Sequence, residues 1–444
     1  MYKNCYAVKK PDVWNVYDIH LWTDEGYTVE EFQNYGYQEC NEYHATHWGL
    51  KDEPLKKVYN WNRETQGMHY ADHTRGNIHT KFLIDKYGTN DEISTTHREV
   101  FFDIEIEMGG ALTPEYIASA PKPITSIAWW DKQTDEWAIV ILDKTGEIKA
   151  GIQDGREIIP VKRENDLIEV FLSRMEAIQP DILVGYNSDY FDIPYIYYRI
   201  KNRLGERTAK RLSPIKIVEE RDPRWYPDQP IRIAGVSSLD YLQLYRQFTF
   251  TQQSSYRLDY IGEIEVGMKK VSYEGTLNDL YDNDLQTFID YNIRDVKILV
   301  ELDSKLDLIE IARGISHLGH TPYEDVNMSS RWLEGAILVY LKKIGVISPN
   351  KPPRPKKLND EKFAGAYVQD PQSGKHDWVY DLDITSMYPS VIRSLNVSPE
   401  TKVGKVEGWN PEQFIKESNT KTYSLMNKEG KEIGKMTETE LKDY

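Results

Sequence analysis

The order of secondary structure expected between residues 100 and 204 is the sequence feature that most restricts the fold. Residues 100–107 alternate apolar and acidic side chains, which is typical of a strand, and two more strand-like runs follow at 124–130 and 137–142. Short connections between three consecutive strands favour an antiparallel meander. The region is therefore expected to begin as a small antiparallel sheet.

A helix, a buried strand and a second helix are expected after the meander. Residues 167–178 carry apolar side chains at helical spacing, with Asn165 or Asp166 as the expected N-cap. A short apolar run at 181–185 indicates a strand, and residues 194–204 indicate another helix. Three strands, a helix, a strand and a helix follow the order of the ribonuclease-H-like fold. We therefore expect the α/β (α+β) class.

Charge and composition exclude some classes of protein. The 444 residues carry a formal net charge of −16, which argues against tight nucleic-acid binding over the whole surface, because Lys and Arg bind phosphates. The net charge does not exclude a basic surface confined to one part of the chain. The two cysteines, Cys5 and Cys40, support no disulfide framework and fit a reducing cytoplasm. No apolar run approaches the roughly 20 residues of a membrane span, so no membrane partner is expected.

A proline-rich basic segment is expected to divide the chain. Residues 348–358 contain four prolines and four basic residues, and proline bars regular structure there, which predicts a linker. Residues 1–99 show no chemical motif and are assigned to an N-terminal domain by position. The expected organisation is this N-terminal domain, a ribonuclease-H-like domain at 100–347, the linker, and a further domain at 359–444.

Several more elements are expected beyond the core of the ribonuclease-H-like region. Residues 215–234 fit a β-hairpin, and residues 285–308 and 327–345 show long helical patterns. A new strand is expected to begin at Trp378, and residues 437–444 fit the start of a helix.

The first expected strand carries the first candidate site residues. Its two-residue period places Asp103, Glu105 and Glu107 on one face. Three acids on one face are costly unless positive charge lies beside them. From this strand alone, the alternative that they line a solvent-facing edge stays open.

Two further carboxylates, Asp192 and Asp295, occupy positions at which a purely structural role is a sufficient explanation for an acidic residue. Asp192 follows a strand and a turn at a helix start, where an N-capping aspartate is the plainer alternative. Asp295 lies four residues after Tyr291 on an expected helix, so the two share a face. That face also carries the apolar residues Phe288, Ile298, Leu299 and Leu302. A carboxylate in such a stripe needs a salt bridge or a metal.

Taken together, these residues resemble the pattern of the DEDD exonucleases, in the subclass that carries a tyrosine. The resemblance implies that Asp103, Glu105, Asp192 and Asp295 are catalytic and bind Mg²⁺ or Mn²⁺ through hard oxygen ligands. Two such ions per site, roughly 4 Å apart, can activate a water and stabilise the leaving 3′ oxygen. Tyr291 would orient the attacking water, and the substrate would be the 3′ end of single-stranded DNA.

Later segments resemble phage-type family B replicative DNA polymerases. Residues 211–214 and 255–260 resemble exonuclease-domain segments of that family. Phe363–Tyr367 resembles its Y-x-G-G/A motif with Phe in place of the first Tyr, and Asp383–Ser390 resembles motif A, D-x-x-S-L-Y-P-S, with Met in place of Leu. The resemblance implies that residues 359–444 begin a polymerase palm domain.

The polymerase resemblance also implies residue roles and partners. Asp383 would be a catalytic metal ligand for nucleotide transfer, and Tyr388 would pack under the incoming sugar. The full set of implied substrate-binding residues is Asn187, Phe191, Gly365, Ser386 and Tyr388. The implied partners are primer–template DNA, single-stranded 3′ ends, deoxynucleoside triphosphates once the palm is completed, a C-terminal polymerase half and a sliding clamp. The implied location is the cytoplasm of an infected bacterium.

Two polymerase motifs do not occur in these 444 residues: the D-T-D of motif C and the K-x₃-N-S-x-Y-G of motif B. The sequence is therefore expected to be truncated or one product of a split polymerase gene, and by itself not to extend a primer. Two alternatives stay open. A free-standing exonuclease is disfavoured by the basic linker and motif A, and a non-catalytic half of a split polymerase is disfavoured by the complete acid set.

Overall fold

The computed structural model describes residues 1–59, 69–70, 78–88, 90, 92–349, 369–398, 401, 405–407, 422–427 and 431–437. The chain forms two compact units, residues 1–354 and 355–444, so the division falls within the segment expected as a linker. The first unit contains both the segment expected as an N-terminal domain and the ribonuclease-H-like segment. Among the described residues, no helix is long and apolar enough to cross a membrane.

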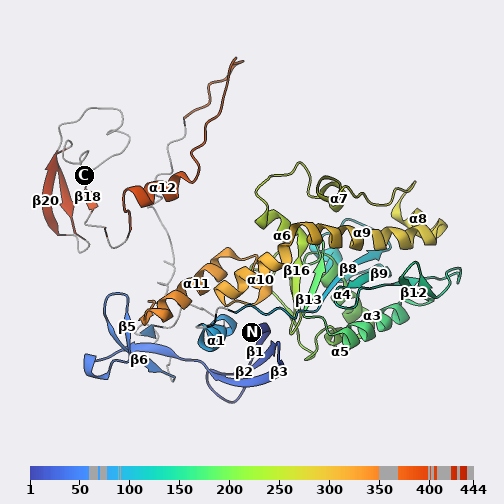
Figure 1. Ribbon diagram of the computed structural model, residues 1–444, viewed down its shortest axis with the longest axis horizontal. Helices are drawn as coiled ribbons and strands as arrows, with labels where there is room; N and C mark the ends of the chain where they lie inside the picture. Colours follow the sequence, from blue (N-terminus) through green and yellow to red (C-terminus); the bar gives the residue numbers. More distant parts are fainter. Residues whose placement is uncertain are drawn as a thin grey trace. The chain divides into compact units, whose positions relative to one another are not determined.

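A seven-stranded sheet organises the first unit (Figure 1). Its strands, in spatial order, are β11 (Gly151–Gln153), β12 (Arg156–Val161), β10 (Glu136–Leu142), β9 (Ile124–Asp131), β8 (Glu99–Ile106), β13 (Ile182–Gly185) and β16 (Ser237–Asp240). Strands β8, β9 and β10 pair antiparallel, which confirms the expected meander. Strand β13 runs parallel to both β8 and β16. The mixed α/β class expected from the sequence is confirmed.

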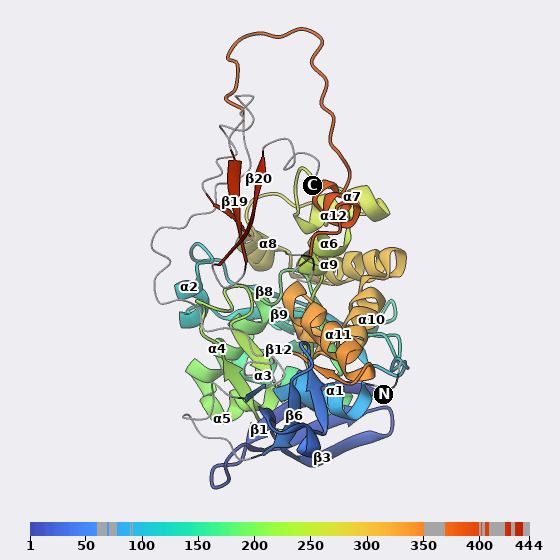
Figure 2. The ribbon, with the colours of Figure 1, turned by 90° about the vertical axis from the view of Figure 1, so that its left-hand side faces the viewer.

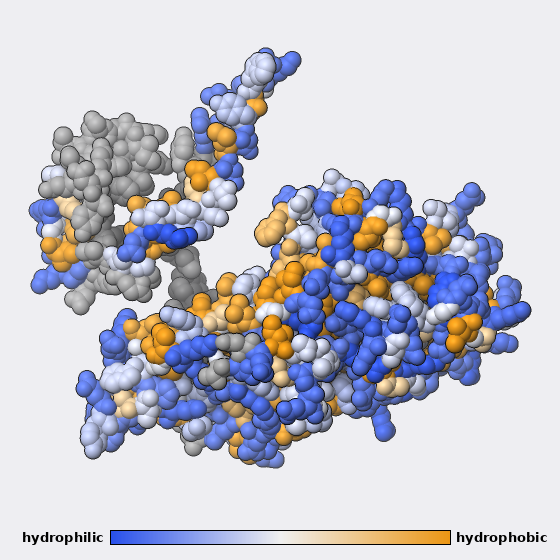
Figure 3. All heavy atoms as spheres, in the orientation of Figure 1, coloured by the Kyte–Doolittle hydropathy of each residue, from blue (hydrophilic) through white to orange (hydrophobic). Residues whose placement is uncertain are grey.

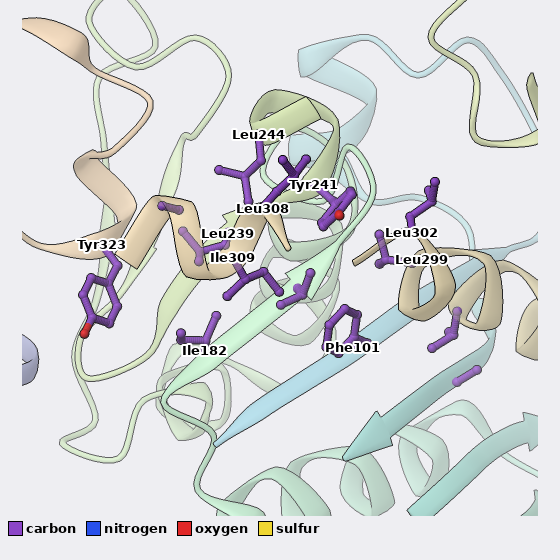
Figure 4. Packing of buried hydrophobic residues seen from close by; sticks show 14 of the residues in the cluster. Phe101, Ile182, Leu239, Tyr241, Leu244, Leu299, Leu302, Leu308, Ile309 and Tyr323 are labelled. Atoms are coloured by element: carbon purple, nitrogen blue, oxygen red, sulfur yellow. The ribbon is translucent and has the colours of Figure 1, made fainter. Parts of the chain in front are cut away.

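Helices cover both faces of this sheet (Figure 1). Those bearing on the site are α3 (Glu164–Ile178), α4 (Asp192–Leu204) and α9 (Leu285–Leu306). Because side chains alternate along β8, Phe102 packs in the apolar cluster of α3 and α4, while Phe101 packs in the cluster of α9. Figure 4 shows Phe101 near Leu299 and Leu302 of α9. Both faces of β8 thus pack against apolar clusters, and within the strand Asp103 and Glu105 are partly exposed.

The start of α3 differs from the expected one. The helix begins at Glu164, so Asn165 and Asp166 lie inside its first turn and neither is the N-cap. Glu164 is buried because the Arg199 guanidinium of α4 donates to both its carboxylate oxygens, at 2.7 and 2.8 Å. Glu164 also accepts the backbone N–H of Ile124 at 2.9 Å. These bonds hold Glu164 inside the fold as the first residue of α3, so the helix begins before both expected caps.

The N-terminal strand is anchored on the same core. The remaining sheets of the first unit are β1 (Tyr2–Lys9), β2 (Val16–Thr23) and β3 (Gly26–Gln33); β17 (Val346–Ile347), β5 (His47–Gly49), β6 (Pro54–Val58), β4 (Gly36–Glu39) and β7 (His69–Tyr70); and β14 (Val218–Glu220) with β15 (Ile231–Ile233), the expected hairpin. Tyr2 is fully buried, and its hydroxyl lies 2.8 Å from the carbonyl oxygen of Thr321. Asn4 donates to Ser237 of β16 at 2.9 Å. The first strand therefore belongs physically to the ribonuclease-H-like unit.

The remaining helices complete the first unit, whose visible surface is mostly hydrophilic (Figure 3). They are α1 (Ile78–Tyr87), α2 (Pro114–Ser119), α5 (Glu206–Ala209), α6 (Tyr241–Phe248), α7 (Leu258–Val266), α8 (Leu277–Asn283), α10 (Leu308–Gly319) and α11 (Ser329–Lys343), with 3₁₀ turns η1 (Glu42–His44), η2 (Lys210–Leu212) and η3 (Tyr323–Asp325). Helices α10 and α11 pack on one another, and α11 reaches α1 (Figure 2). The expected helices at 285–308 and 327–345 correspond to α9 and α11.

The second unit differs from expectation where a strand was expected to begin. Its elements are α12 (Met387–Ser394) and the antiparallel strands β18 (Lys405–Glu407), β19 (Thr422–Met426) and β20 (Glu432–Thr437). The described residues 369–386 form no strand, and Trp378 has a φ of +60°, which a strand does not accommodate. A strand needs a paired neighbour, and these residues have none in the described part. Of residues 437–444, expected to start a helix, Thr437 is instead the last residue of β20, and residues 438–444 lie outside the described residues.

Candidate active site

Strand β8 and helix α9 bring three of the expected acids together. Carboxylate oxygens of Asp103, Glu105 and Asp295 all lie within 4.8 Å of one another. Asp103 and Glu105 share the face of β8 that packs against α9, because they alternate with residues that face the other core. Asp295 is buried, with 2% of its surface exposed. The structure thus joins residues that lie almost 200 positions apart.

The fourth expected acid, Asp192, approaches this cluster from a different element. It is the first residue of α4, whose N-cap is Phe191, so Asp192 is not the cap itself. The Asp192 carboxylate accepts the backbone N–H of Ile104 on β8 at 3.2 Å. Ile104 lies between Asp103 and Glu105 in the sequence, and the Asp192 charge contributes to raising the pKa of Asp103. Asp192 is therefore a close neighbour of the three-carboxylate cluster.

Burial and mutual repulsion oppose ionisation of this group. Burial, then the charges of Glu105 and Asp192, raise the pKa of Asp103 well above its usual range. Burial, followed by the Asp295 charge, raises the pKa of Glu105 to about 8. Burial also raises the pKa of Asp192 to about 7. Such a group ionises readily only beside positive charge.

Lys270 supplies one positive charge at this place. It forms an ion pair with Asp295, and its Nζ donates to the Tyr291 hydroxyl at 3.1 Å. Burial disfavours the charged form of Lys270, but Asp295, Tyr291 and Asp103 outweigh it and raise the lysine pKa. Tyr291 and Asp295 therefore both contact the Lys270 ammonium group, which no sequence motif indicated.

Asn292 holds Asp103 in place and was likewise missed. Its Nδ2 donates to Asp103 Oδ2 at 2.7 Å, and its Oδ1 accepts the Ser126 hydroxyl at 2.7 Å. The residue is fully buried. A buried polar side chain beside Tyr291 on an amphipathic helix was the available signal, but sequence alone does not reveal the partner.

The donor set fits a hard divalent cation. The residues that could hold it, Asp103, Glu105, Asp192 and Asp295, offer only carboxylate oxygens, the ligands that Mg²⁺ and Mn²⁺ prefer. Asp295 Oδ1 is buried and has no hydrogen-bond partner among the described residues. An orphaned buried carboxylate oxygen beside other carboxylates is the arrangement that a metal ion would satisfy.

A cleft opens beside the carboxylates. It has a volume of about 1000 Å³ and is lined by three expected site residues, Asp103, Asn187 and Tyr291. The lining also includes aromatic and basic residues, which are Tyr186, Tyr256, Arg257, Tyr260, Lys269, Lys270 and Tyr273, together with aliphatic and serine side chains and the acid Asp259. Rings and cations suit the bases and phosphates of a nucleic-acid strand. Phe191 does not line the cleft; its ring lies 5.6 Å from that of Tyr195.

The expected palm residues do not form a comparable site within the second unit. Asp383, Ser386 and Tyr388 are exposed, and Ser386 is the N-cap of α12. Tyr388 has 67% of its surface exposed. Gly365 lies outside the described residues.

The raised carboxyl pKa values predict how pH and metal affect stability. Between the usual glutamate pKa of 4.5 and about 8, the folded chain keeps a proton on Glu105 that the unfolded chain has lost. The folded state binds more protons, so metal-free stability falls as pH rises through this window. Divalent ions favour the ionised site. We expect Mn²⁺ to raise the melting temperature by about 5 °C at pH 8 and hardly at all at pH 5. Thermal unfolding with Mn²⁺ or chelator tests this, and equal shifts at both pH values would contradict it.

Comparisons with known proteins identify two matching family models and several relatives. Residues 59–261 match the family model for the exonuclease domain of DNA polymerase family B, and residues 327–438 match the model for DNA polymerase family B. The DNA-directed DNA polymerase of Escherichia phage RB69 is 33% identical over 352 residues, covering 73% of this chain and 38% of that protein.

Two further relatives are also DNA polymerases that match this chain over part of their own length. The DNA-directed DNA polymerase of Enterobacteria phage T4 is 33% identical over 284 residues, which cover 63% of this chain and 31% of that protein. A DNA polymerase of Archaeoglobus fulgidus is 28% identical over 263 residues, covering 57% of this chain and 31% of that protein. The matched part of this chain thus spans roughly a third of the length of these curated relatives.

Proposed function

This chain belongs to DNA polymerase family B, and from that membership and its acidic site we propose that it carries a metal-dependent 3′→5′ exonuclease acting on unpaired DNA ends. The observation that carries the proposal is the convergence of Asp103, Glu105 and Asp295 within 4.8 Å, with Asp192 bound to the same strand. Carboxylates that share so small a volume are costly without cations.

Each site residue has a separate task in the proposed reaction. Two Mg²⁺ or Mn²⁺ ions, when bound, supply activation of a water and stabilisation of the leaving 3′ oxygen. Asp103, Glu105, Asp192 and Asp295 hold those ions, and Asn292 keeps the Asp103 carboxylate oriented. We assign the orientation of the attacking water to the Tyr291 hydroxyl, which accepts a hydrogen bond from Lys270 Nζ at 3.1 Å.

The cleft favours a single strand as substrate. Its aromatic and basic lining can hold bases and phosphates, while the chain as a whole is acidic. An end must be unpaired to enter, and a mismatch lowers the cost of unpairing. We include Asn187 and Phe191 among the DNA-binding residues, Asn187 as part of the cleft wall and Phe191 through the loop that it shares with Asn187.

The second unit supports a proposal about nucleotide transfer. We propose that Asp383 binds a metal and that Gly365, Ser386 and Tyr388 help to bind primer–template and a deoxynucleoside triphosphate. Transfer needs a second acidic motif that these 444 residues do not contain, so a polymerase half that supplies it is part of the proposal. A sliding clamp and the cytoplasm of an infected bacterium belong to the same proposal. The match at 327–438 counts against a free-standing exonuclease.

The direction of cleavage provides the test of the proposed function. We expect a 5′-labelled single-stranded oligonucleotide to shorten stepwise, and the label to remain on the longer product. A fully paired blunt duplex should be cut more slowly, because its terminus must first unpair. Chelator should stop the reaction, and Mg²⁺ or Mn²⁺ should restore it. Early release of the 5′-terminal nucleotide, or full activity in chelator, would contradict the proposal.

A further inference from the structure

The loop that presents Asp192 is folded tightly against the sheet. It comprises residues 186–191 and connects β13 to α4. At its entrance, a Cβ on Gly185 would lie 2.5 Å from Ser188 Cβ and 3.3 Å from the Phe102 carbonyl oxygen, so only glycine fits there. Asn187 adopts a left-handed φ of +61°, a conformation that asparagine tolerates better than most residues. One backbone bond lies within the loop, from the Phe191 N–H to the Asn187 carbonyl oxygen at 3.0 Å, and further bonds reach the loop from outside.

One buried carboxylate supplies these bonds. Asp240, at the end of β16, is fully buried. Its Oδ1 accepts the backbone N–H of Asn187 at 2.9 Å, and its Oδ2 accepts the backbone N–H of Asp189 at 3.3 Å. Oδ1 also accepts the backbone N–H of Leu242 at 2.9 Å, which caps α6. A single side chain thus ties the loop to the end of a central strand.

A second carboxylate reinforces the same loop. Asp189, with 3% of its surface exposed, accepts the Ser238 hydroxyl of β16 and the Gln229 side-chain amide, the latter at 2.9 Å. Ser238 and Asp240 stand two apart on β16, so the same strand holds the loop both through the Asp189 side chain and through backbone N–H groups. A helix cap alone explains the bond to Leu242, but it explains neither bond to the loop.

We propose that Asp240 is a positioning residue of the nuclease site: its carboxylate holds the 186–191 loop on β16 and so sets where Asp192 stands beside Asp103 and Glu105. The inference rests on the proposed function, because it assigns Asp192 to the metal site. Beyond the loop, the Asp192 side chain is oriented by the Ile104 N–H at 3.2 Å. A loop released from Asp240 would let Asp192 move away from β8.

The test compares Asp240→Asn with a matched control, Asp143→Asn. Asparagine at 240 keeps one oxygen acceptor and replaces Oδ2 by an amide that cannot accept the Asp189 N–H. Asp143 is equally buried, at 1% exposure, and anchors a turn by accepting the N–H groups of Gly146 at 2.7 Å and Ile148 at 2.9 Å. That turn follows β10 and contains none of the site acids. The control therefore reproduces the loss of a buried carboxylate that anchors a loop, without any effect on the position of a site acid.

Full-length variants are measured on a single-stranded oligonucleotide, and Mn²⁺ binding is measured separately by electron paramagnetic resonance. We expect Asp240→Asn to lower kcat about 10- to 100-fold and to weaken Mn²⁺ binding about tenfold, which is the usual effect of removing a residue that orients a metal ligand. KM for the oligonucleotide should change less than kcat, because Tyr186 and Asn187 are the only residues of the 186–191 loop that line the cleft. Asp143→Asn should leave kcat, KM and Mn²⁺ affinity unchanged although its melting temperature falls.

The outcomes separate the positioning role from the proposed function. Wild-type kcat and Mn²⁺ affinity in Asp240→Asn, or equal losses in Asp143→Asn, would overturn the positioning role. A wild-type chain that binds Mn²⁺ but cuts no DNA would overturn the nuclease, while weaker Mn²⁺ binding by Asp240→Asn would still support positioning. If wild type neither cuts DNA nor binds Mn²⁺, both fail. Should Asp240→Asn not fold, Asp240→Ser keeps a capping oxygen for α6 but offers one acceptor in place of two, and it is expected to lower kcat about tenfold; an unchanged kcat would overturn the role.

Discussion

Replacing Asp103 and Glu105 together by Ala is expected to lower the nuclease rate by at least about a thousandfold while the chain remains folded. Both carboxylates lie in the cluster with Asp295, and without them the site loses half of its proposed metal ligands. The metal-free fold should not suffer, because burial and mutual repulsion already raise the pKa of both groups. Removing groups that repel one another relieves the folded state.

Glu107 provides the matched control for this prediction. The sequence places it on the same face as Asp103 and Glu105, but the structure places it just beyond β8, where it pairs with Lys122 at 2.6 Å. Glu107→Ala should therefore keep the wild-type rate. Single-turnover cleavage of a labelled single-stranded oligonucleotide measures all three proteins. A double variant within about tenfold of wild type would remove Asp103 and Glu105 from the chemistry.

Asp295→Asn is expected to lower the nuclease rate by a similar factor, at least about a thousandfold. Unlike changes at Asp103, it is also expected to destabilise the metal-free chain. Its carboxylate is the ion-pair partner of Lys270, which would be left largely buried and without that partner. Breaking a buried pair from one side is costly, and partial exposure of Lys270 reduces the cost to about 2–3 kcal/mol. Asp103→Asn removes a repelled charge and can keep its bond from Asn292, so it should raise the free energy of unfolding.

Urea unfolding in chelator measures these opposite signs. Adding Lys270→Met to Asp295→Asn removes the unpaired cation, and should recover most of the lost stability without restoring cleavage. The double variant thus separates the structural role of the ion pair from the proposed metal-binding role of Asp295. Equal destabilisation by Asp103→Asn and Asp295→Asn would show that Lys270 does not discriminate between the two acids.

Much of the site was accessible from local sequence patterns. The two-residue period of β8 placed Asp103 and Glu105 on one face, and the four-residue spacing on α9 placed Tyr291 and Asp295 on another. The resemblance to a known exonuclease pattern then joined these pieces with Asp192. Local patterns gave wrong predictions where a distant partner matters. The start of α3 lies earlier than predicted, at Glu164, whose carboxylate binds Arg199 of α4. The strand predicted at Trp378 is absent, and in the described part no neighbouring strand pairs with these residues.

The sequence by itself determined which acids are available, and that Asp103 shares a face with Glu105 and Tyr291 with Asp295, because strand and helix periods depend only on spacing along the chain. Only the tertiary structure decided what surrounds them. Lys270 comes from a loop, Asn292 faces Ser126 across the core, and Asp240 reaches the 186–191 loop from a parallel strand. No local pattern marks such residues, because their roles depend on groups brought near by packing. The charge balance of the site, and the support of Asp192, are therefore properties of the folded chain.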